Sequence, residues 1–284
     1  MLIVSFVIIL LVTALAYIFL RATQLPFLSP KSFLKTSPTN NEVLVCIGDS
    51  ITHGRVSQNY VDMIRRYFSS RNITVINAGI NNDLAITIEQ RLDEIMQCKP
   101  DVVTLLIGTN DVCADVSSVN LREFEKEKKI PTGYIPSIDN YKRHLTAVVS
   151  RLKNQAQKSP RIILLSLPVF GENTNCNDFK LAEKYSDVVK RVSFDMGVDY
   201  IPLGELMSKR LVSYSSDGIP YCDSKSRSMM YKAIIKRYGL RQSWEEISNN
   251  SGLYLTTDLL HLNRVGATIV AEEIVALIDE GYSC

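Results

Sequence analysis

The chain of 284 residues is 46% hydrophobic and 22% charged, which is the composition of a globular protein with one large core. Its 32 Lys and Arg residues almost balance 30 Asp and Glu residues, and a net charge of +2 argues against nucleic acid as a partner. Six cysteines are widely spaced without a CxxC pair, so the sequence predicts neither a small disulfide-linked scaffold nor a zinc site.

The N-terminal segment, residues 1–20, carries no charge and is followed by Arg21. A helix of this length rises about 30 Å, the thickness of the hydrocarbon core of a bilayer. The segment therefore predicts an uncleaved transmembrane helix and a single-pass membrane protein. A cleaved signal peptide is the alternative, but the long apolar run and the lack of a preceding basic segment argue against it. Basic residues after the segment favour a cytoplasmic domain, whereas sequons at Asn72 and Asn249 favour the opposite side, so the side stays open.

Beyond the apolar segment, a proline-containing linker at residues 21–41 leads into a domain at residues 42–284 in which short apolar strands alternate with helices. Strands are expected at 43–48, 73–77, 101–108, 161–168 and 198–202, and helices at 60–68, 84–96, 141–155, 178–196 and 264–280. This alternation predicts βαβ units, and hence a three-layer α/β/α sandwich around a mostly parallel five-stranded sheet.

Two inserts, at 112–137 and 203–257, interrupt the alternation and rise from the strand ends that carry the polar motifs. We expect them to shape or cover a pocket. Residues 229–247 of the second insert are expected to be helical, and their apolar side chains either form a lid or bury the insert on the core.

Polar motifs follow the first three predicted strands. GDSITHG (48–54) follows the first strand, NAGINND (77–83) the second and GTND (108–111) the third. Parallel sheets carry their sites at the carboxyl ends of the strands, so these motifs are expected to converge.

Among the three histidines, His261 is the best candidate for a base that activates Ser50. A serine nucleophile needs a base near its Oγ, and the base needs an acid that sets its tautomer. His144 lies in the middle of a predicted helix, and His53 is only three residues from Ser50. His261 lies in DLLHLN, just before the last helix, and Asp258 precedes it by three residues. Each residue alone has a structural explanation, such as a helix cap for Ser50, so the prediction depends on their joint occurrence.

With GDSITHG, NAGINND, GTND and DLLHLN in this order, the chain resembles the GDSL, or SGNH, hydrolases over about residues 42–280. The resemblance implies a flavodoxin-like fold and the cleavage of esters and thioesters without metal or cofactor. It also implies that Ser50 is the nucleophile, His261 the general base and Asp258 the acid that orients it. The implied oxyanion hole consists of the Ser50 N–H, an N–H of the second motif and the side chain of Asn110.

The second motif departs from the family pattern N-x-G-x-x-G, because Asn82 occupies the position of the second glycine. Asparagine tolerates a positive φ better than other residues with a side chain, so we expect the Asn82 N–H to complete the oxyanion hole. The Gly79 N–H is the alternative donor.

The sequence therefore predicts a serine hydrolase that cleaves carboxylic esters, either an acyl ester or a lysophospholipid. Its partners would be a small-molecule ester or lipid and the membrane. A carbohydrate O-deacetylase is the alternative, since Tyr134, Tyr214 and Tyr221 in the inserts suit a glycan site. A catalytically silent membrane-anchored binding protein is the non-enzyme alternative, supported by the altered second motif. The lack of a Gly-rich phosphate loop argues against a nucleotide binder.

Overall fold

The computed structural model of the chain describes residues 2–36, 41–154, 159–215 and 218–282. Parts of several expected segments lie outside the described residues. They are position 1 of the N-terminal segment, positions 37–40 of the linker, position 155 of the helix expected at 141–155, positions 216 and 217 of the second insert, and positions 283 and 284 at the end of the domain.

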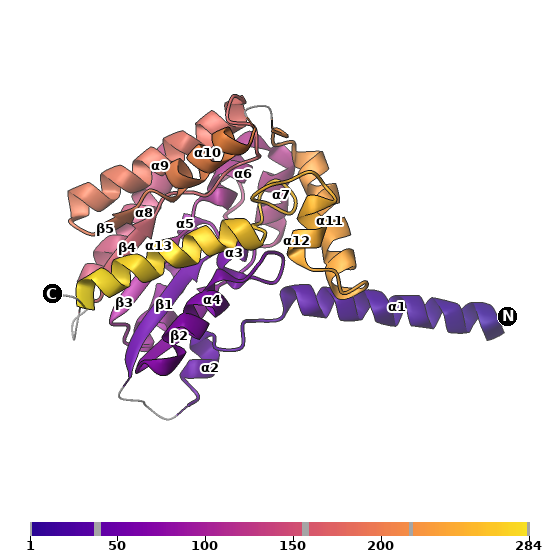
Figure 1. The fold of residues 1–284 in the computed structure, drawn as a ribbon, viewed down its shortest axis with the longest axis horizontal. Coiled ribbons are helices and arrows are strands. Elements are labelled where there is room, and N and C mark those ends of the chain that lie inside the picture. The colour runs from indigo at the N-terminus through magenta and orange to yellow at the C-terminus, as the bar shows by residue number, and fades with distance from the viewer. Residues whose placement is uncertain (1, 37–40, 155–158, 216–217, 283–284) are drawn as a thin grey trace.

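Five parallel strands form one sheet in the order β2-β1-β3-β4-β5 (Figure 1). The strands are β1 (Glu42–Gly48), β2 (Ile73–Gly79), β3 (Val102–Leu106), β4 (Arg161–Leu165) and β5 (Asp199–Ile201). The predicted five-stranded parallel sheet is confirmed, and its strand order is that of flavodoxin-like folds. Gly48 at the end of β1 pairs with Gly79 of β2 and Leu106 of β3, so the three polar motifs begin at the same level of the sheet.

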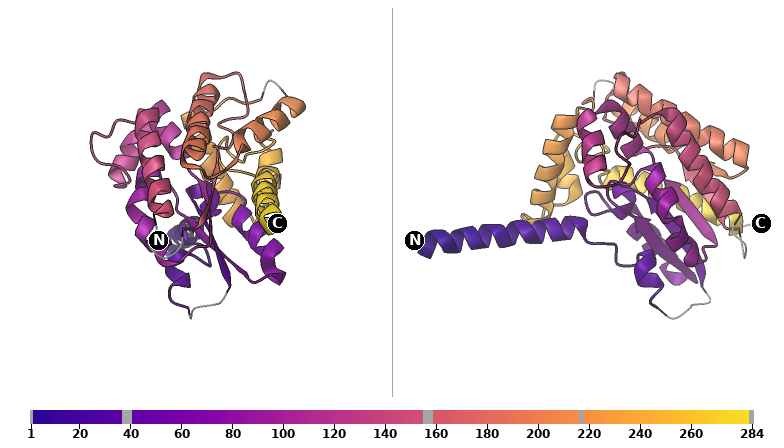
Figure 2. Two further views of the ribbon diagram at one scale, coloured as in Figure 1. Left: turned by 90° about the vertical axis from the view of Figure 1, so that its left-hand side faces the viewer. Right: turned by 180° about the vertical axis from the view of Figure 1, so that it is seen from behind.

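Helices cover both faces of the sheet, so the predicted three-layer arrangement is confirmed (Figure 2). Val43, Val45 and Ile47 of β1 belong to one core, whereas Leu44 and Cys46 belong to the other, which explains the continuous apolar run of this strand. The first core is covered by α5 (Ala85–Gln97), α6 (Thr109–Val116), α8 (Ile138–Lys153) and α9 (Asn177–Met196). The second is covered by α4 (Tyr60–Tyr67), η1 (Phe68–Ser70), α10 (Leu203–Tyr214) and α13 (Arg264–Tyr282).

The remaining helices surround the carboxyl edge of the sheet or precede it. They are α2 (Pro30–Phe33), α3 (Ser50–His53), α7 (Ser118–Lys126), α11 (Asp223–Tyr238) and α12 (Trp244–Asn249). The helix expected over 229–247 is interrupted, because α11 ends at Tyr238 and α12 begins with a capping box of Ser243 and Glu246. Trp244 is buried against Ala233 and Ile247 in a small core of its own, which joins α12 to α11.

The prediction of a transmembrane helix at residues 1–20 is wrong. A helix does form there, α1 (Leu2–Thr23), and it projects from the domain (Figure 1). Within the described part of the chain, however, no helix combines the length and the apolar composition that crossing a membrane requires. The last turn of α1 is bound to the domain instead, since Ala22 is buried and its carbonyl oxygen accepts a hydrogen bond from Asn81 Nδ2 at 3.2 Å.

Candidate active site

Ser50 stands at the start of α3, in a sharp turn between β1 and that helix. Asp49 caps the helix by accepting a hydrogen bond from the Ile51 N–H at 2.9 Å, and Gly54 ends it with φ 72°. Gly48 precedes the turn, and a Cβ at this position would lie 2.5 Å from the Leu106 carbonyl oxygen of the neighbouring strand. The glycine and the aspartate of GDS therefore shape the turn that carries the serine.

The structure brings Ser50, His261 and Asp258 together in one buried chain of hydrogen bonds. Ser50 Oγ lies 2.8 Å from His261 Nε2, and His261 Nδ1 lies 2.7 Å from Asp258 Oδ2. Asp258 Oδ1 also accepts the backbone N–H groups of Leu260 (3.1 Å) and His261 (2.8 Å). The carboxylate thus orients both the imidazole ring and the loop that carries it.

The carboxylates around the site control its charge. Burial alone would lower the pKa of His261, but the charge and hydrogen bond of Asp258 outweigh burial and raise that pKa above its ordinary value. Burial raises the pKa of Asp49 to about 7, although its hydrogen bond with the Ile51 N–H opposes the rise. Burial likewise raises the pKa of Asp111 to about 8.

Gly79 and Asn82 are the two candidates in the second motif for the backbone N–H of an oxyanion hole. Only the N–H of Asn82 is free of a hydrogen bond to the described residues. The Gly79 N–H donates to Asn77 Oδ1 at 2.9 Å, and a Cβ on Gly79 would lie 2.2 Å from the backbone nitrogen of His53. Gly79 therefore allows β2 to approach α3 closely. Asn82 has φ 62°, and its N–H makes no hydrogen bond to any described residue. Its side chain donates to Glu127 Oε2 at 2.9 Å.

Asn110 follows β3 in the first turn of α6, and its Nδ2 donates to the Asp83 carbonyl oxygen at 2.9 Å. Asp83 is itself held by ion pairs with Arg91 (2.7 Å) and Lys129 (2.7 Å). The second and third motifs are thus connected, and a pocket of about 140 Å³ is lined by Asn110 and Asn82 together with Ser50 and His261.

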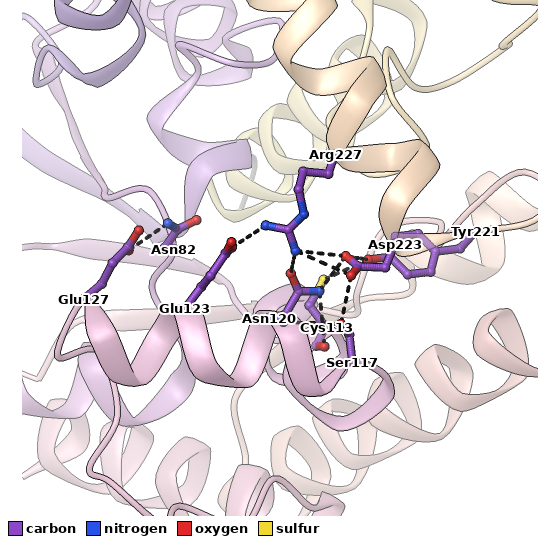
Figure 3. Close-up of polar contacts among 9 residues, drawn as sticks. All are labelled: Asn82, Cys113, Ser117, Asn120, Glu123, Glu127, Tyr221, Asp223 and Arg227. Atoms are coloured by element: carbon purple, nitrogen blue, oxygen red, sulfur yellow. Dashed lines mark hydrogen bonds and ion pairs between the residues drawn. The ribbon is translucent and has the colours of Figure 1, made fainter.

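Charged side chains of α7 and α11 form the far wall of this pocket (Figure 3). Arg227 pairs with Glu123, donates to Asn120 Oδ1 at 2.7 Å and lies 3.3 Å from Asp223. With Glu127, three carboxylates stand against one guanidinium in this wall. The pocket, which we call the polar pocket, is therefore rich in hydrogen-bonding groups and net acidic.

Sequence reasoning missed Glu172, which holds the segment before Asp258. This buried carboxylate accepts the N–H of Tyr254 at 2.7 Å on one oxygen. Its other oxygen accepts the N–H of Leu255 and of Thr256, both at 2.8 Å, and the Thr256 hydroxyl at 2.7 Å. The only signal in the sequence was an acidic residue in the loop after the fourth strand, because its partners are more than 80 residues away in sequence.

The other two histidines do not contact Ser50. His53 is buried behind Gly79, and burial, together with the charge of Arg55, lowers its pKa to about 4, so its ring is neutral. His144 lies on α8, and its Nδ1 lies 2.6 Å from Glu89 Oε2. Among the residues that the structure describes, no cluster of His, Cys, Asp and Glu side chains suits a metal ion.

The model of the GDSL-like Lipase/Acylhydrolase family matches residues 46–269, most of the chain. The chain belongs to this family. It is accordingly a hydrolase of ester bonds, and the resemblance seen in its motifs is confirmed. No curated protein matches the sequence significantly.

Among solved structures, the GDSL hydrolase is similar to a catalytic mutant of Axe2, an acetylxylan esterase from Geobacillus stearothermophilus. The two are 19% identical with a TM-score of 0.57, over 85% of this chain and 95% of that one. It is also similar to the acetyl xylan esterase AlAXEase, at 20% identity and a TM-score of 0.55, over 83% and 99% of the two chains. A third similar structure is LAE5, an alpha/beta hydrolase from the metagenome of Lake Arreo, Spain. It is 19% identical with a TM-score of 0.54, over 83% and 94%. At these identities the likeness shows the fold alone.

Proposed function

We propose that the protein cleaves carboxylic esters with Ser50 as nucleophile, His261 as general base and Asp258 as the acid that orients the base. One observation carries the proposal. The buried hydrogen-bond chain runs from Ser50 Oγ to His261 Nε2 (2.8 Å) and from His261 Nδ1 to Asp258 Oδ2 (2.7 Å). Both distances are within the hydrogen-bond reach that proton transfer requires.

The reaction follows from these contacts. Ser50 Oγ attacks the ester carbonyl carbon while its proton moves to His261 Nε2, and Asp258 stabilises the imidazolium that forms. The oxyanion is stabilised by the N–H groups of Ser50 and Asn82 and by Asn110 Nδ2. His261 then gives its proton to the leaving alcohol, and a water molecule that His261 deprotonates hydrolyses the acyl-enzyme.

The polar pocket supports a neutral, hydroxylated alcohol as the leaving group. Its hydrogen-bonding side chains suit hydroxyl groups, whereas three carboxylates against one guanidinium disfavour a phosphate or another anion. O-deacetylation of a carbohydrate is the second candidate function. It is favoured by this pocket and by similarity to proteins described as acetylxylan esterases.

A fluorophosphonate probe and a set of esters test the proposal. We expect the probe to label Ser50 in the wild-type protein but not in the Ser50→Ala variant. We also expect nitrophenyl esters or acetylated sugars to be hydrolysed only when Ser50 is present. A folded wild-type protein that is neither labelled nor active on any ester would refute the proposal and favour a binding protein.

A further inference from the structure

A second, larger cavity opens on the other side of the reactive residues. It has a volume of about 570 Å³ and is lined by Ser50 and His261 at one end and by side chains of α1 and α11 along its length. We call it the apolar cavity. Its volume is within the range of about 300–1,000 Å³ that is usual for pockets that bind small organic ligands.

One stripe of α1 forms a wall of the apolar cavity. Leu15, Ile18, Phe19 and Ala22 line it, and they follow the i, i+3, i+4, i+7 spacing that puts residues on one face of a helix. This face of α1 is turned toward the reactive serine, because Ser50 lines the same cavity. Leu15 is 59% exposed and Phe19 is 67% exposed, so the wall is not filled by other side chains of the protein.

The opposite wall comes from α11, which lies beside the C-terminal part of α1 (Figure 1). Met230, Tyr231 and Ile234 line the apolar cavity from this helix. Met230 and Tyr231 also line the polar pocket, and so do Asn82 and Glu127, so the two spaces adjoin at the serine. An ester held at Ser50 therefore meets an apolar surface on one side and charged groups on the other.

The position of α1 is fixed by the same loops that carry the site. Asn81, the neighbour of Asn82, donates to the Ala22 carbonyl oxygen at 3.2 Å, and Arg55 Nε donates to the Gln24 carbonyl oxygen at 3.2 Å. Both bonds come from the loops that follow β2 and α3. They therefore fix the position of the α1 wall relative to Ser50.

We propose that the apolar cavity binds the acyl chain of the ester, and that α1 thereby makes the enzyme selective for chains longer than acetyl. This inference rests on the proposed function, since the chain would be attached to Ser50 in the acyl-enzyme. An acyl group is the occupant that the cavity favours, because its lining is mostly apolar and the nucleophile stands at one end. The alcohol then occupies the polar pocket, and an acetyl group would leave the α1 wall uncovered.

The experiment measures kcat/KM of the full chain on nitrophenyl acetate, butyrate and octanoate. Each methylene buried in the cavity is expected to raise kcat/KM about fourfold, equivalent to ~0.8 kcal/mol. The variants Ile18→Trp and Ile234→Trp fill the cavity from its two walls. Each should lower the octanoate-to-acetate ratio about tenfold or more. Leu20→Trp is the matched control, because Leu20 is 64% exposed on α1 and does not line the cavity.

The outcomes separate the two proposals. Ser50-dependent cleavage of acetate with no gain for octanoate would overturn the acyl-chain inference and leave the proposed function standing. The inference would also be overturned if the octanoate-to-acetate ratio of kcat/KM fell equally in Leu20→Trp. The same holds if this ratio is unchanged in both cavity variants while their circular dichroism is native. If no ester is cleaved and the fluorophosphonate does not label Ser50, the proposed function itself fails.

Discussion

Replacing Glu172 with glutamine tests whether this buried carboxylate positions the loop that carries Asp258 and His261. Its two oxygens accept four hydrogen bonds at 2.7–2.8 Å, three from consecutive backbone N–H groups and one from the hydroxyl of Thr256. Glutamine has the same shape but only one acceptor oxygen. In the better of its two orientations, the amide oxygen keeps three donors and the amide nitrogen faces the Tyr254 N–H.

The magnitude follows from these contacts. The Tyr254 N–H loses a hydrogen bond to a charged group, which costs about 1.5–3 kcal/mol. The three remaining bonds change from a charged to a neutral acceptor and each loses roughly 0.5–1 kcal/mol, since charge-assisted bonds are about twice as strong. We therefore expect Glu172→Gln to lower the free energy of unfolding by ~3–6 kcal/mol. A loosened loop should also slow fluorophosphonate labelling of Ser50 by about 10- to 100-fold.

The assay is urea unfolding followed by the fluorescence of Trp244, the single tryptophan, which is buried in the native state. Glu94→Gln is the matched control, because Glu94 is exposed on α5 and its replacement should change stability by no more than about 0.5 kcal/mol. If Glu172→Gln unfolds at the same urea concentration as the wild type and labels at the same rate, the positioning role of Glu172 is refuted.

Three further predictions concern the site itself. His261 must be neutral to act as a base, so kcat/KM should rise with pH and level off above the raised pKa of His261. The variant Asp258→Asn removes the charge that raises this pKa. The rise of kcat/KM should therefore shift to lower pH in this variant, while kcat falls by about 10⁴. An acid limb that stays in place in this variant would contradict the assigned cause. Asn110→Ala should lower kcat by about 10²–10³ with little change in KM, as measured by steady-state kinetics, whereas a change in KM alone would remove Asn110 from the oxyanion hole. Asn82→Gly should keep most of the activity and Asn82→Val should lose it, because a β-branched residue is strained at φ 62°; equal rates for the two variants would argue against the Asn82 N–H as a donor.

The local features of the site could be predicted from the sequence because neighbouring residues determine them. The apolar run before GDS predicts a buried strand, and glycine and aspartate around the serine predict the turn into α3. The three-residue spacing of Asp258 and His261 lets one short loop present both side chains. The alternation of strands and helices likewise predicts the parallel sheet, since βαβ connections allow few other topologies.

Contacts between distant parts of the chain were decided only by the tertiary structure. The sequence left Gly79 and Asn82 as alternative donors. We propose Asn82 because, in the structure, the Gly79 N–H already donates to Asn77 and the backbone of His53 approaches Gly79 closely. Glu172 could not be assigned because its partners are over 80 residues away.

The apolar N-terminal segment shows most clearly that the sequence alone does not determine which distant parts of the chain come into contact. Its composition alone predicts a helix and, wrongly here, a membrane crossing, because hydropathy does not say which surface an apolar face will contact. The tertiary structure binds the last turn of α1 to Asn81 and turns one stripe of this helix toward Ser50. Local propensity and spacing thus determined the strands, the turn that carries Ser50 and the loop that carries Asp258 and His261. The partner of each buried or apolar face, in contrast, depended on the folding of the whole chain.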